Sequence, residues 1–375
     1  MKHCPTMLLN NLVLPTEQRD PKQNPTEEFF YVDIASVDNE TKAIVATKRI
    51  VGADAPSRAR KVIRTGDVIV STVRPNLNAV ALVPSNLDNQ ICSTGFSVLR
   101  PSPKMMSGYL FAFARSPLFI DYLVARTTGA NYPAVNDSEV KSVSLPMPPL
   151  TEQNRIVKLL DEADELRKLR ARADLRTASL IPALFHQMFG DPDRNSKNWP
   201  VKPFGELVSN QDGRRKPVKA SDRADRQGQY PYYGASGIID YVEDYLFEGT
   251  ALLIGEDGAN LLARSTPIAF LAQGKYWVNN HAHVVTDNGK ADLIYLCEAL
   301  NLRDLTDFIT GSAQPKLNQA NMNRMPIHVP PLALQKEFAQ RATEIRELEA
   351  CQATSRRQLD AFFQSMLHRA FTGEL

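Results

Sequence analysis

Cysteine is scarce in this 375-residue chain, and long apolar runs are missing. The four cysteines lie far apart at positions 4, 92, 297 and 351, which excludes a disulfide framework and a CxxC zinc knuckle and fits a reducing interior. No apolar run approaches the ~20 residues that a transmembrane helix needs. The first residues lack the apolar segment and cleavage site of a secretory signal. We therefore expect a cytoplasmic protein without a membrane partner.

The signatures of nucleotide-driven and methyl-transferring enzymes are also missing. No GxxxxGK phosphate loop occurs, so this chain does not itself carry ATP-driven translocation. An adenine methyltransferase would need Asn or Asp before Pro-Pro-aromatic, but the two Pro-Pro pairs follow Met147 and Val329, and no Gly-rich cofactor loop is found. We expect a non-catalytic protein with no catalytic residues and no cofactor.

Two constellations that could bind a metal ion are weak. Asp33 followed by Glu40-Thr41-Lys42 fits a metal nuclease only loosely, because such triplets are common in charged chains. His281 and His283 with Asp287 could ligate a metal, since alternation along a strand places both imidazoles on one face. A structural role on paired strands is the favoured interpretation of these histidines, so no metal site is expected.

The net charge does not indicate a class of binding partner, because the chain has 44 Lys and Arg residues and 42 Asp and Glu residues. An argument for nucleic-acid binding must therefore rest on local patches. Residues 42–64 carry seven basic residues against Asp54 alone, and residues 214–226 carry six basic residues before Tyr230, Tyr232 and Tyr233. A solvated loop explains either patch alone, but one patch in each half of the chain favours contacts with phosphates.

The chain repeats itself at a fixed offset of 182 residues. Thr128-Gly129-Ala130-Asn131 recurs as Thr310-Gly311-Ser312-Ala313, with Pro133 and Asn136 matched by Pro315 and Asn318. Pro148-Pro149-Leu150-Thr151-Glu152-Gln153 recurs as Pro330-Pro331-Leu332-Ala333-Leu334-Gln335, and His186 and Phe189 recur as His368 and Phe371. The gapless register over about 60 residues indicates a duplicated layout.

The segments after the two Pro-Pro-Leu motifs, 150–190 and 332–371, read as long helices. Apolar residues recur every three or four positions in both segments, which gives each a single apolar stripe. A long rod with one narrow apolar seam needs a partner helix, and the other copy is the simplest partner, in an antiparallel coiled coil. Pro182 predicts a kink or an end of the first helix near Ile181.

The segments before each rod look mixed and strand-rich. Short β-branched runs bounded by turn residues occur at 29–34, 66–73, 79–83 and 250–254. One helix is expected before each Thr-Gly motif, at 108–126 and 291–308. The predicted fold is α+β, with two mixed α/β domains at 1–147 and 191–329 joined by spacer helices at 148–190 and 330–375, in a pseudo-two-fold internal repeat.

This order resembles the specificity subunit of type I restriction-modification enzymes. The resemblance covers nearly the whole chain and rests on residues 148–157, on Tyr230-Pro231-Tyr232-Tyr233-Gly234-Ala235-Ser236-Gly237-Ile238, on 310–318 and on Asn198-Trp199-Pro200. It implies a non-catalytic reader in which two target-recognition domains each read half of a split site on double-stranded DNA. It also implies that the helices dock two methyltransferase subunits, and that restriction subunits join that core.

Loops that carry Arg, Lys, Asn, Gln or aromatic side chains are the candidates for DNA contact. In the first domain they are Lys48, Arg49, Arg58, Arg60, Lys61, Arg74, Asn76, Asn131 and Tyr132; in the second they are Arg214, Arg215, Lys216, Tyr232, Tyr233, Asn260, Arg264, Gln314 and Lys316. The first Thr-Gly motif has Ala134 where the second has Lys316. The alternative function is a two-headed coiled-coil adaptor that binds protein partners without reading DNA sequence.

Overall fold

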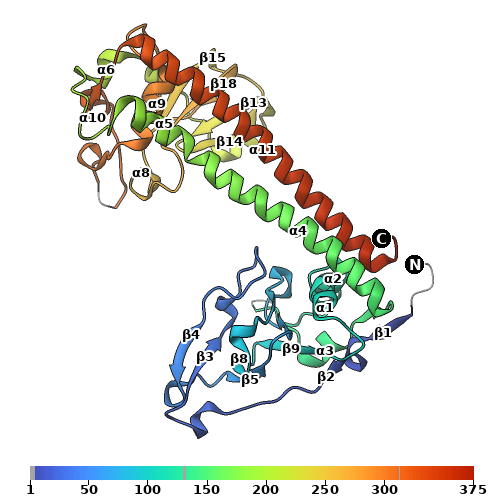
Figure 1. Ribbon diagram of the computed structural model, residues 1–375. Coiled ribbons are helices and arrows are strands. Elements are labelled where there is room, and N and C mark those ends of the chain that lie inside the picture. Colours follow the sequence, from blue (N-terminus) through green and yellow to red (C-terminus); the bar gives the residue numbers. More distant parts are fainter. Residues whose placement is uncertain (1–4, 130–131, 312) are drawn as a thin grey trace. The chain divides into compact units, whose positions relative to one another are not determined.

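A computed structural model describes residues 5–129, 132–311 and 313–375 (Figure 1). The chain divides into two compact units. Unit 1 comprises Met1–Ala171 and Thr354–Leu375, and unit 2 comprises Arg172–Ala353. Each unit therefore contains one strand-rich domain and a part of both long helices.

Unit 1 holds two four-stranded sheets and one two-stranded pair. The first sheet has the order β2 (Val13–Leu14), β9 (Phe96–Pro101), β6 (Val68–Ser71), β7 (Val80–Leu82), and the second has the order β4 (Lys48–Val51), β3 (Glu28–Val32), β8 (Gln90–Ser93), β5 (Ala59–Ile63). Strand β1 (Thr6–Leu8) pairs with β10 (Ser144–Pro146). The helices are α1 (Ser107–Ala114), α2 (Pro117–Val124), α3 (Asp137–Lys141), and 3-10 turns at Leu9–Asn11, Pro21–Gln23, Ile34–Ser36, Gly52–Asp54, Pro75–Leu77 and Ser85–Leu87.

Unit 2 has the same set of sheets. The first has the order β12 (Val208–Asn210), β19 (Ala282–Asp287), β16 (Ala251–Gly255), β17 (Ala269–Ala272), and the second has the order β14 (Gly237–Val242), β13 (Gln227–Gly234), β18 (Lys275–Val278), β15 (Phe247–Glu248). Strand β11 (Val201–Pro203) pairs with β20 (Pro326–His328). The helices are α6 (Phe204–Leu207), α7 (Ala220–Ala224), α8 (Asn260–Ala263), α9 (Leu293–Leu302), α10 (Gln319–Arg324), and 3-10 turns at Asp212–Arg214 and Thr306–Phe308.

The two domains share one topology although their sequences match only around the Thr-Gly motif. In both, the first sheet is antiparallel throughout. In both, the second sheet contains one parallel pair, β3 with β8 and β13 with β18. The predicted internal repeat is confirmed, and it extends through the strands that sequence comparison left unmatched.

The long helices are α4 (Leu150–Ala178), α5 (Leu180–Phe189) and α11 (Leu332–Thr372), and they run antiparallel (Figure 1). In unit 1 the Arg167 guanidinium donates to Asp360 at 2.7 Å, and in unit 2 the Gln352 amide donates to Thr177 at 2.9 Å. The partner number on α11 falls as the number on α4 rises, as an antiparallel pair requires. The predicted coiled coil is thereby confirmed.

Proline explains where the first long helix and the helix before the first Thr-Gly motif are interrupted. Pro182 lies in the first turn of α5, and because it has no N–H, the carbonyl of Ala178 lacks its helical donor and α4 ends there. The single helix expected at 108–126 was wrong: Ser116 accepts the N–H of Phe119 and Pro117 opens α2, so two helices form. The helix expected at 291–308 ends at Leu302.

Each unit has a core in which the domain packs on both long helices. In unit 1 the buried residues of α4 and α11 that join the domain core are Ile156, Leu160, Ala163, Phe363, Leu367, Ala370 and Phe371; in unit 2 those of α5 and α11 are Ile181, Phe185, Phe189, Phe338 and Ala342. Ile156, Phe363, Leu367 and Phe371 lie 182 positions from Phe338, Ile181, Phe185 and Phe189. The repeat therefore reproduces the core that fixes each domain to the helices. Among the described residues, no helix combines the length and apolarity needed to span a bilayer.

Candidate nucleic-acid interface

The Thr-Gly loop of unit 2 is a short closed turn. The backbone N–H of Thr310 donates to the carbonyl of Lys316, and that of Lys316 donates back to Thr310, both at 2.8 Å. Gly311 has φ +83°, and a Cβ there would lie 2.6 Å from the carbonyl oxygen of Gln314. Only glycine fits this position, and the turn that it allows holds Gln314 exposed to solvent.

The Thr-Gly loop of unit 1 closes in the same way. Thr128 and Ala134 exchange two backbone hydrogen bonds at 3.0 Å, and Gly129 has φ +92°. Tyr132 occupies the position that Gln314 has in unit 2, and its side chain is 57% exposed. The guanidinium carbon of Arg74 lies 5.3 Å from the centre of the Tyr132 ring. One loop frame therefore presents an Arg–Tyr pair in unit 1, and Gln314 and Lys316 in unit 2.

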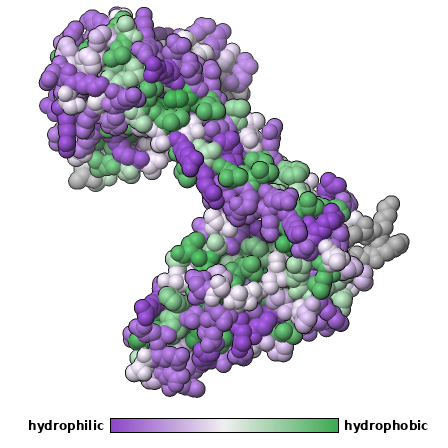
Figure 2. Space-filling model, viewed as in Figure 1, coloured by the Kyte–Doolittle hydropathy of each residue, from purple (hydrophilic) through white to green (hydrophobic). Residues whose placement is uncertain are grey.

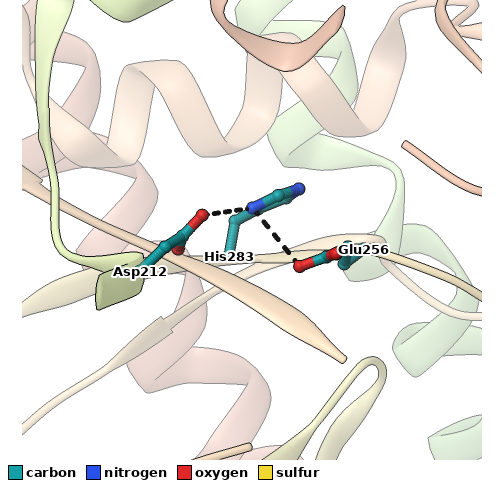
Figure 3. A group of neighbouring side chains, drawn as sticks. All are labelled: Asp212, Glu256 and His283. Carbon is teal, nitrogen blue, oxygen red and sulfur yellow. Dashed lines mark hydrogen bonds and ion pairs between the residues drawn. The ribbon is translucent and has the colours of Figure 1, made fainter. Parts of the chain in front are cut away.

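A buried polar cluster supports the loop of unit 2 (Figure 3). His283 on β19 is 1% exposed; its Nδ1 lies 2.6 Å from Asp212 and its Nε2 lies 2.8 Å from the carbonyl of Leu317. The same Nδ1 lies 3.7 Å from Glu256, and the backbone N–H of Val284 donates to Asp212 at 2.8 Å. Both ring nitrogens thus lie within hydrogen-bond distance of oxygen atoms. The cluster therefore connects β19 to the end of the Thr-Gly loop.

Asp212, Glu256 and His283 could offer ligand atoms to a metal ion, since these atoms lie within 4.8 Å of one another. Two side chains already neutralise the carboxylates, however. Arg215 donates to Glu256 at 2.7 Å and lies 3.4 Å from Asp212, while the ammonium of Lys316 lies 3.1 Å from Glu256. This donor set is an ion-pair network in which cationic side chains stand where a metal would, so we do not propose a metal site.

The two carboxylates are held in their charged forms. Burial alone would raise the pKa of Asp212, but hydrogen bonds from His283 and from the Val284 N–H outweigh it and place that pKa below its usual value. Burial likewise opposes the charge of Glu256, and the hydrogen bond from Arg215 with the charge of His283 lowers its pKa. Two sequence-predicted residues, Arg215 and Lys316, are therefore fixed by a network that sequence reasoning missed.

The two metal constellations weighed from the sequence do not form. His281 is exposed and its Nδ1 lies 2.9 Å from Asp257, whereas His283 is buried in the cluster just described. In unit 1, Asp33 bonds Ser36 and pairs with Lys48 at 2.6 Å, while the ammonium of Lys42 donates to the carbonyl of Asn78. These partners give each group a structural role.

The basic segment of unit 1 is partly exposed and partly built into the domain. Lys48, Arg49 and Arg58 are exposed, and so are Arg74 and Asn76 beyond the segment. Lys48 pairs with Asp33 and Arg49 pairs with Glu28, whereas no ion pair of Arg58 occurs within the described part of the chain. Arg60 and Lys61 are largely covered: Arg60 lies 3.4 Å from Asp20, and Lys61 donates to the carbonyl of Phe96 at 2.7 Å. Five of the candidate residues are therefore exposed, whereas Arg60 and Lys61 make contacts inside the domain.

The candidates of unit 2 divide in the same way. Arg214, Lys216, Gln314 and Lys316 are exposed. Tyr232 is only 1% exposed, and its hydroxyl accepts the N–H of Val218 at 2.8 Å. Tyr233 is half-buried against Phe270 and Tyr276, with ring centroids 5.9 and 5.8 Å away. Tyr232 is therefore part of the domain core, so the expectation that its ring reaches DNA was wrong, whereas Tyr233 is only partly covered and its contact with DNA stays a prediction.

Two further candidates hold local turns. The Asn260 side chain accepts the N–H of Thr266 at 3.0 Å and donates to its carbonyl at 2.9 Å. Arg264 donates to the carbonyls of Leu300 and Arg303 at the end of α9. Asn131 lies outside the described residues, so its role stays a prediction.

Known proteins were compared with the whole chain. The family model described as the type I restriction modification DNA specificity domain matches residues 22–173 and 196–353. A putative type I restriction enzyme specificity subunit of Haemophilus influenzae is 40% identical over 137 residues, which cover 36% of this chain and 34% of that protein. The HindI specificity subunit of the same organism is 28% identical over 42% of this chain and 33% of that protein. The matches thus span about a third of these curated relatives.

Solved structures match over more of the chain. A chain from a structure described as the structural basis underlying complex assembly and conformational transition of the type I R-M system is 28% identical, with a TM-score of 0.70 and full coverage of both chains. The HsdS subunit from Thermoanaerobacter tengcongensis is also 28% identical, with a TM-score of 0.51 over 99% of this chain and 97% of that one. Because the family model covers both domains and most of the residues, the chain belongs to the type I restriction-modification DNA specificity family.

Proposed function

We propose that this chain is the specificity subunit of a type I restriction-modification complex and reads a split site on double-stranded DNA. One observation supports this proposal above the others: two domains of one topology present the same glycine-dependent loop with different side chains at matched positions. Tyr132 is matched by Gln314, and Ala134 by Lys316. Two domains that recognise different half-sites need the same loop backbone with different side chains, because base readout depends on the side chains that reach the groove.

The DNA-contact set of this proposal follows exposure. It comprises Lys48, Arg49, Arg58, Arg74, Asn76, Tyr132, Arg214, Lys216, Gln314 and Lys316, with Asn131 and Tyr233 kept as predictions. Arg60, Lys61, Arg215, Asn260 and Arg264 position these residues through contacts inside their own domains. The exposed cations would bind phosphates, and the Arg–Tyr pair and Gln314 would face base edges. The boundaries 1–147, 148–190, 191–329 and 330–375 belong to the same proposal.

The helices offer two equivalent docking faces, which favours two methyltransferase subunits. In Figure 2, hydrophobic side chains interrupt the hydrophilic surface along the segment of α4 and α11. The exposed apolar residues are Leu166, Leu169 and Phe362 in unit 1 and Leu348, Cys351 and Leu180 in unit 2. Each of the first three lies 182 positions from its counterpart. Matched exposed apolar side chains on each copy fit two identical partners, and restriction subunits would join through that assembly.

In this proposal the chain is not itself an enzyme and acts in the cytoplasm. Its role is to bring methyltransferase and restriction subunits to one DNA sequence. Cys92 and Cys297 are free and buried, as expected in a reducing compartment. The two-headed protein adaptor, the alternative from the sequence, would need the same helices but no exposed cations on its loops.

The test uses the full chain co-purified with type I methyltransferase subunits. Genomic DNA from a methylation-free host that expresses the complex is sequenced for modified adenine. A split motif is expected, and duplexes that carry it should bind more tightly than random duplexes, with affinity falling steeply as salt rises. Absence of any split modified motif, together with salt-insensitive failure to bind duplexes, would leave the adaptor function.

A further inference from the structure

Unit 1 contains a hollow of about 600 Å³ between the domain and its own stretches of α4 and α11. Its domain side is formed by the loop 39–42, Asn78, Arg115 and Ile120, and its helix side by residues 164–171 and 356–367. The volume lies within the range of small-ligand sites. Every lining residue belongs to unit 1.

Asn78 bonds both Lys42 and the residue that precedes Arg115 at the domain side. The ammonium of Lys42 donates to the Asn78 carbonyl at 2.6 Å, and the Asn78 amide donates to the carbonyl of Ala114, the residue before Arg115, at 3.0 Å. The Oδ1 of Asn78 and the Nε of Arg115 are buried and have no hydrogen-bond partner among the described residues. The Nε–H of Arg115 is a donor without an acceptor, which an anion could supply, whereas the Oδ1 of Asn78 is an acceptor that needs a donor such as water.

Three acidic side chains line the hollow; the two on the helix side are paired, whereas no ion pair of Glu40 in the loop 39–42 occurs among the described residues. Asp360 bonds Arg167 at 2.7 Å, and Asp164 lies 3.0 Å from Arg167 and 3.2 Å from Lys168. Lys42 and Arg115 have no carboxylate within ion-pair distance in the described residues. Arg115 instead lies over the rings of Phe111 and Phe363, 4.2 and 5.4 Å from their centres. Aromatic faces compensate part of its charge and leave its hydrogen-bond donors unused.

Like charges near one another in a half-buried site are costly without an anion. Burial and the neighbouring charge of Arg115 lower the pKa of Lys42 to about 8 against the opposing charge of Asp38. Burial also lowers the pKa of Arg115, although Asp164 and Asp161 oppose that shift. An anion between the two side chains would remove this repulsion.

We propose that the hollow binds a phosphate group, held by Lys42 and by the guanidinium of Arg115. A guanidinium fork with a nearby ammonium is a recurrent arrangement for phosphate oxygens. Asn78 orients both cations, Lys42 through its carbonyl and Arg115 through the preceding residue. The paired acids on the helix side favour a single phosphate over an extended polyanion. The phosphate comes either from the DNA backbone or from a small phosphate ester.

The test titrates inorganic phosphate into the full chain at constant ionic strength, with chloride as the exchanged anion. Calorimetry should show saturable binding, and the Tm should rise with phosphate concentration. Lys42→Gln should weaken phosphate affinity at least tenfold and should remove most of the rise in Tm that phosphate produces. Lys158→Gln removes the same charge from an exposed position on α4 and should bind like the unaltered chain. Arg115→Gln should also weaken phosphate affinity. If Arg115→Gln does not fold, the affinity of Lys42→Gln alone tests the proposal.

Addition of a duplex with methyltransferase subunits separates the two sources. A backbone phosphate in the hollow would abolish binding of inorganic phosphate, whereas a site for a small ester would bind phosphate equally with DNA present. No saturable phosphate binding by the unaltered chain, or unchanged affinity in Lys42→Gln, would overturn the proposal. The titration without DNA does not depend on the proposed function, so the two can fail separately.

Discussion

Phe371, at the end of α11, packs on Tyr109 of α1 with ring centroids 5.2 Å apart. Phe189, at the end of α5, packs on Tyr295 of α9 at 4.8 Å in unit 2. The two phenylalanines lie 182 positions apart. The Tyr109 hydroxyl donates to the carbonyl of Pro146 at 2.9 Å, and the Tyr295 hydroxyl donates to His328 at 2.7 Å. The end of α11 therefore packs on the domain that precedes α4, and the end of α5 packs on the domain that precedes α11.

Removal of one aromatic anchor should destabilise one unit strongly. Phe371→Ala and Phe189→Ala each delete a buried ring, so each should lower the free energy of unfolding by about 3–5 kcal/mol. Phe362→Ala is the control, since this ring is 54% exposed and its loss should change stability by less than ~0.5 kcal/mol. Urea unfolding measures all three. Equal effects of Phe362→Ala and Phe371→Ala would contradict the anchor role.

The glutamine of the Pro-Pro-Leu-x-x-Gln motif should matter through hydrogen bonds. Buried Gln153 accepts the N–H of Met106 at 2.9 Å and donates to Lys104 and Pro148, at 3.0 and 2.9 Å. Gln335 accepts the N–H of Asp292 at 2.9 Å and donates to Pro330 at 2.7 Å.

Gln153→Met keeps the side-chain volume but leaves these backbone groups without hydrogen-bond partners. It should lower the free energy of unfolding by about 1–3 kcal/mol for each group left unpaired. Thermal unfolding checks this change, with Gln340→Met on exposed α11 as the control. Gln335→Met should behave like Gln153→Met. If both Gln153→Met and Gln335→Met were as stable as the unaltered chain, water molecules would be replacing the hydrogen bonds of the glutamines.

The helices and the repeat could be predicted from the sequence, because their signals are periodic and local. The spacing of apolar residues predicted the long helices, and the fixed offset predicted the duplication whose two copies pair with each other. The glutamine motif could be recognised but not explained. Its partners, the residues that begin α1 and α9, lie more than 40 positions away, and no local pattern reports them.

The loop contacts were harder to predict because charge and aromaticity do not reveal burial. Tyr232 and Arg215 have the composition of DNA contacts, yet one is core and the other is an ion-pair partner of Glu256. The network of Asp212 and Glu256 could not be predicted because its members come from a 3-10 turn, from β19 and from the loop after β16, which lie far apart in the sequence. The alternation of His281 and His283 before Val284 and Val285 was the available signal, and it predicted a structural role on a strand without naming the partners of His283.

Substitution of the loop glycines should affect one half-site each. Gly311→Ala forces a Cβ against the Gln314 carbonyl at φ +83°, a strain of about 1–2 kcal/mol before the clash is added. Affinity for the half-site read by unit 2 should fall by about tenfold or more. Gly129→Ala should do the same for the other half-site.

Gly249→Ala is the matched control, because Gly249 also has positive φ but no atom within 4 Å of its added Cβ. Affinities for duplexes with one altered half-site measure the effect once the motif is known. A loss spread equally over both half-sites would argue against one loop per half-site.

Acid should weaken unit 2 through Asp212 and Glu256. Both groups have pKa values lowered in the folded chain, so their contribution is present above their ordinary values, near 3.8 and 4.5, and is lost as pH falls through the folded values. The urea midpoint of unit 2 should therefore drop between pH 5 and pH 3. Asp212→Asn should be less stable at pH 7 and should lose less on acidification. An identical acid slope in that variant would exclude Asp212 as a source.

The helix pair should set the spacing between the half-sites. Segments 170–176 and 352–358 lie 182 positions apart, on the stretch of the two helices between Arg167–Asp360 and Thr177, and the second segment includes Gln352, the partner of Thr177. Deletion of both heptads preserves the apolar stripe and shortens each rod by about 10.5 Å. That length corresponds to about three base pairs, so the complex should methylate the same half-sites at a shorter separation. Deletion of one heptad alone is the control and should disrupt the pairing of the helices. If the variant with both deletions still methylated sites with the original spacing, the helices would not set the distance between the half-sites.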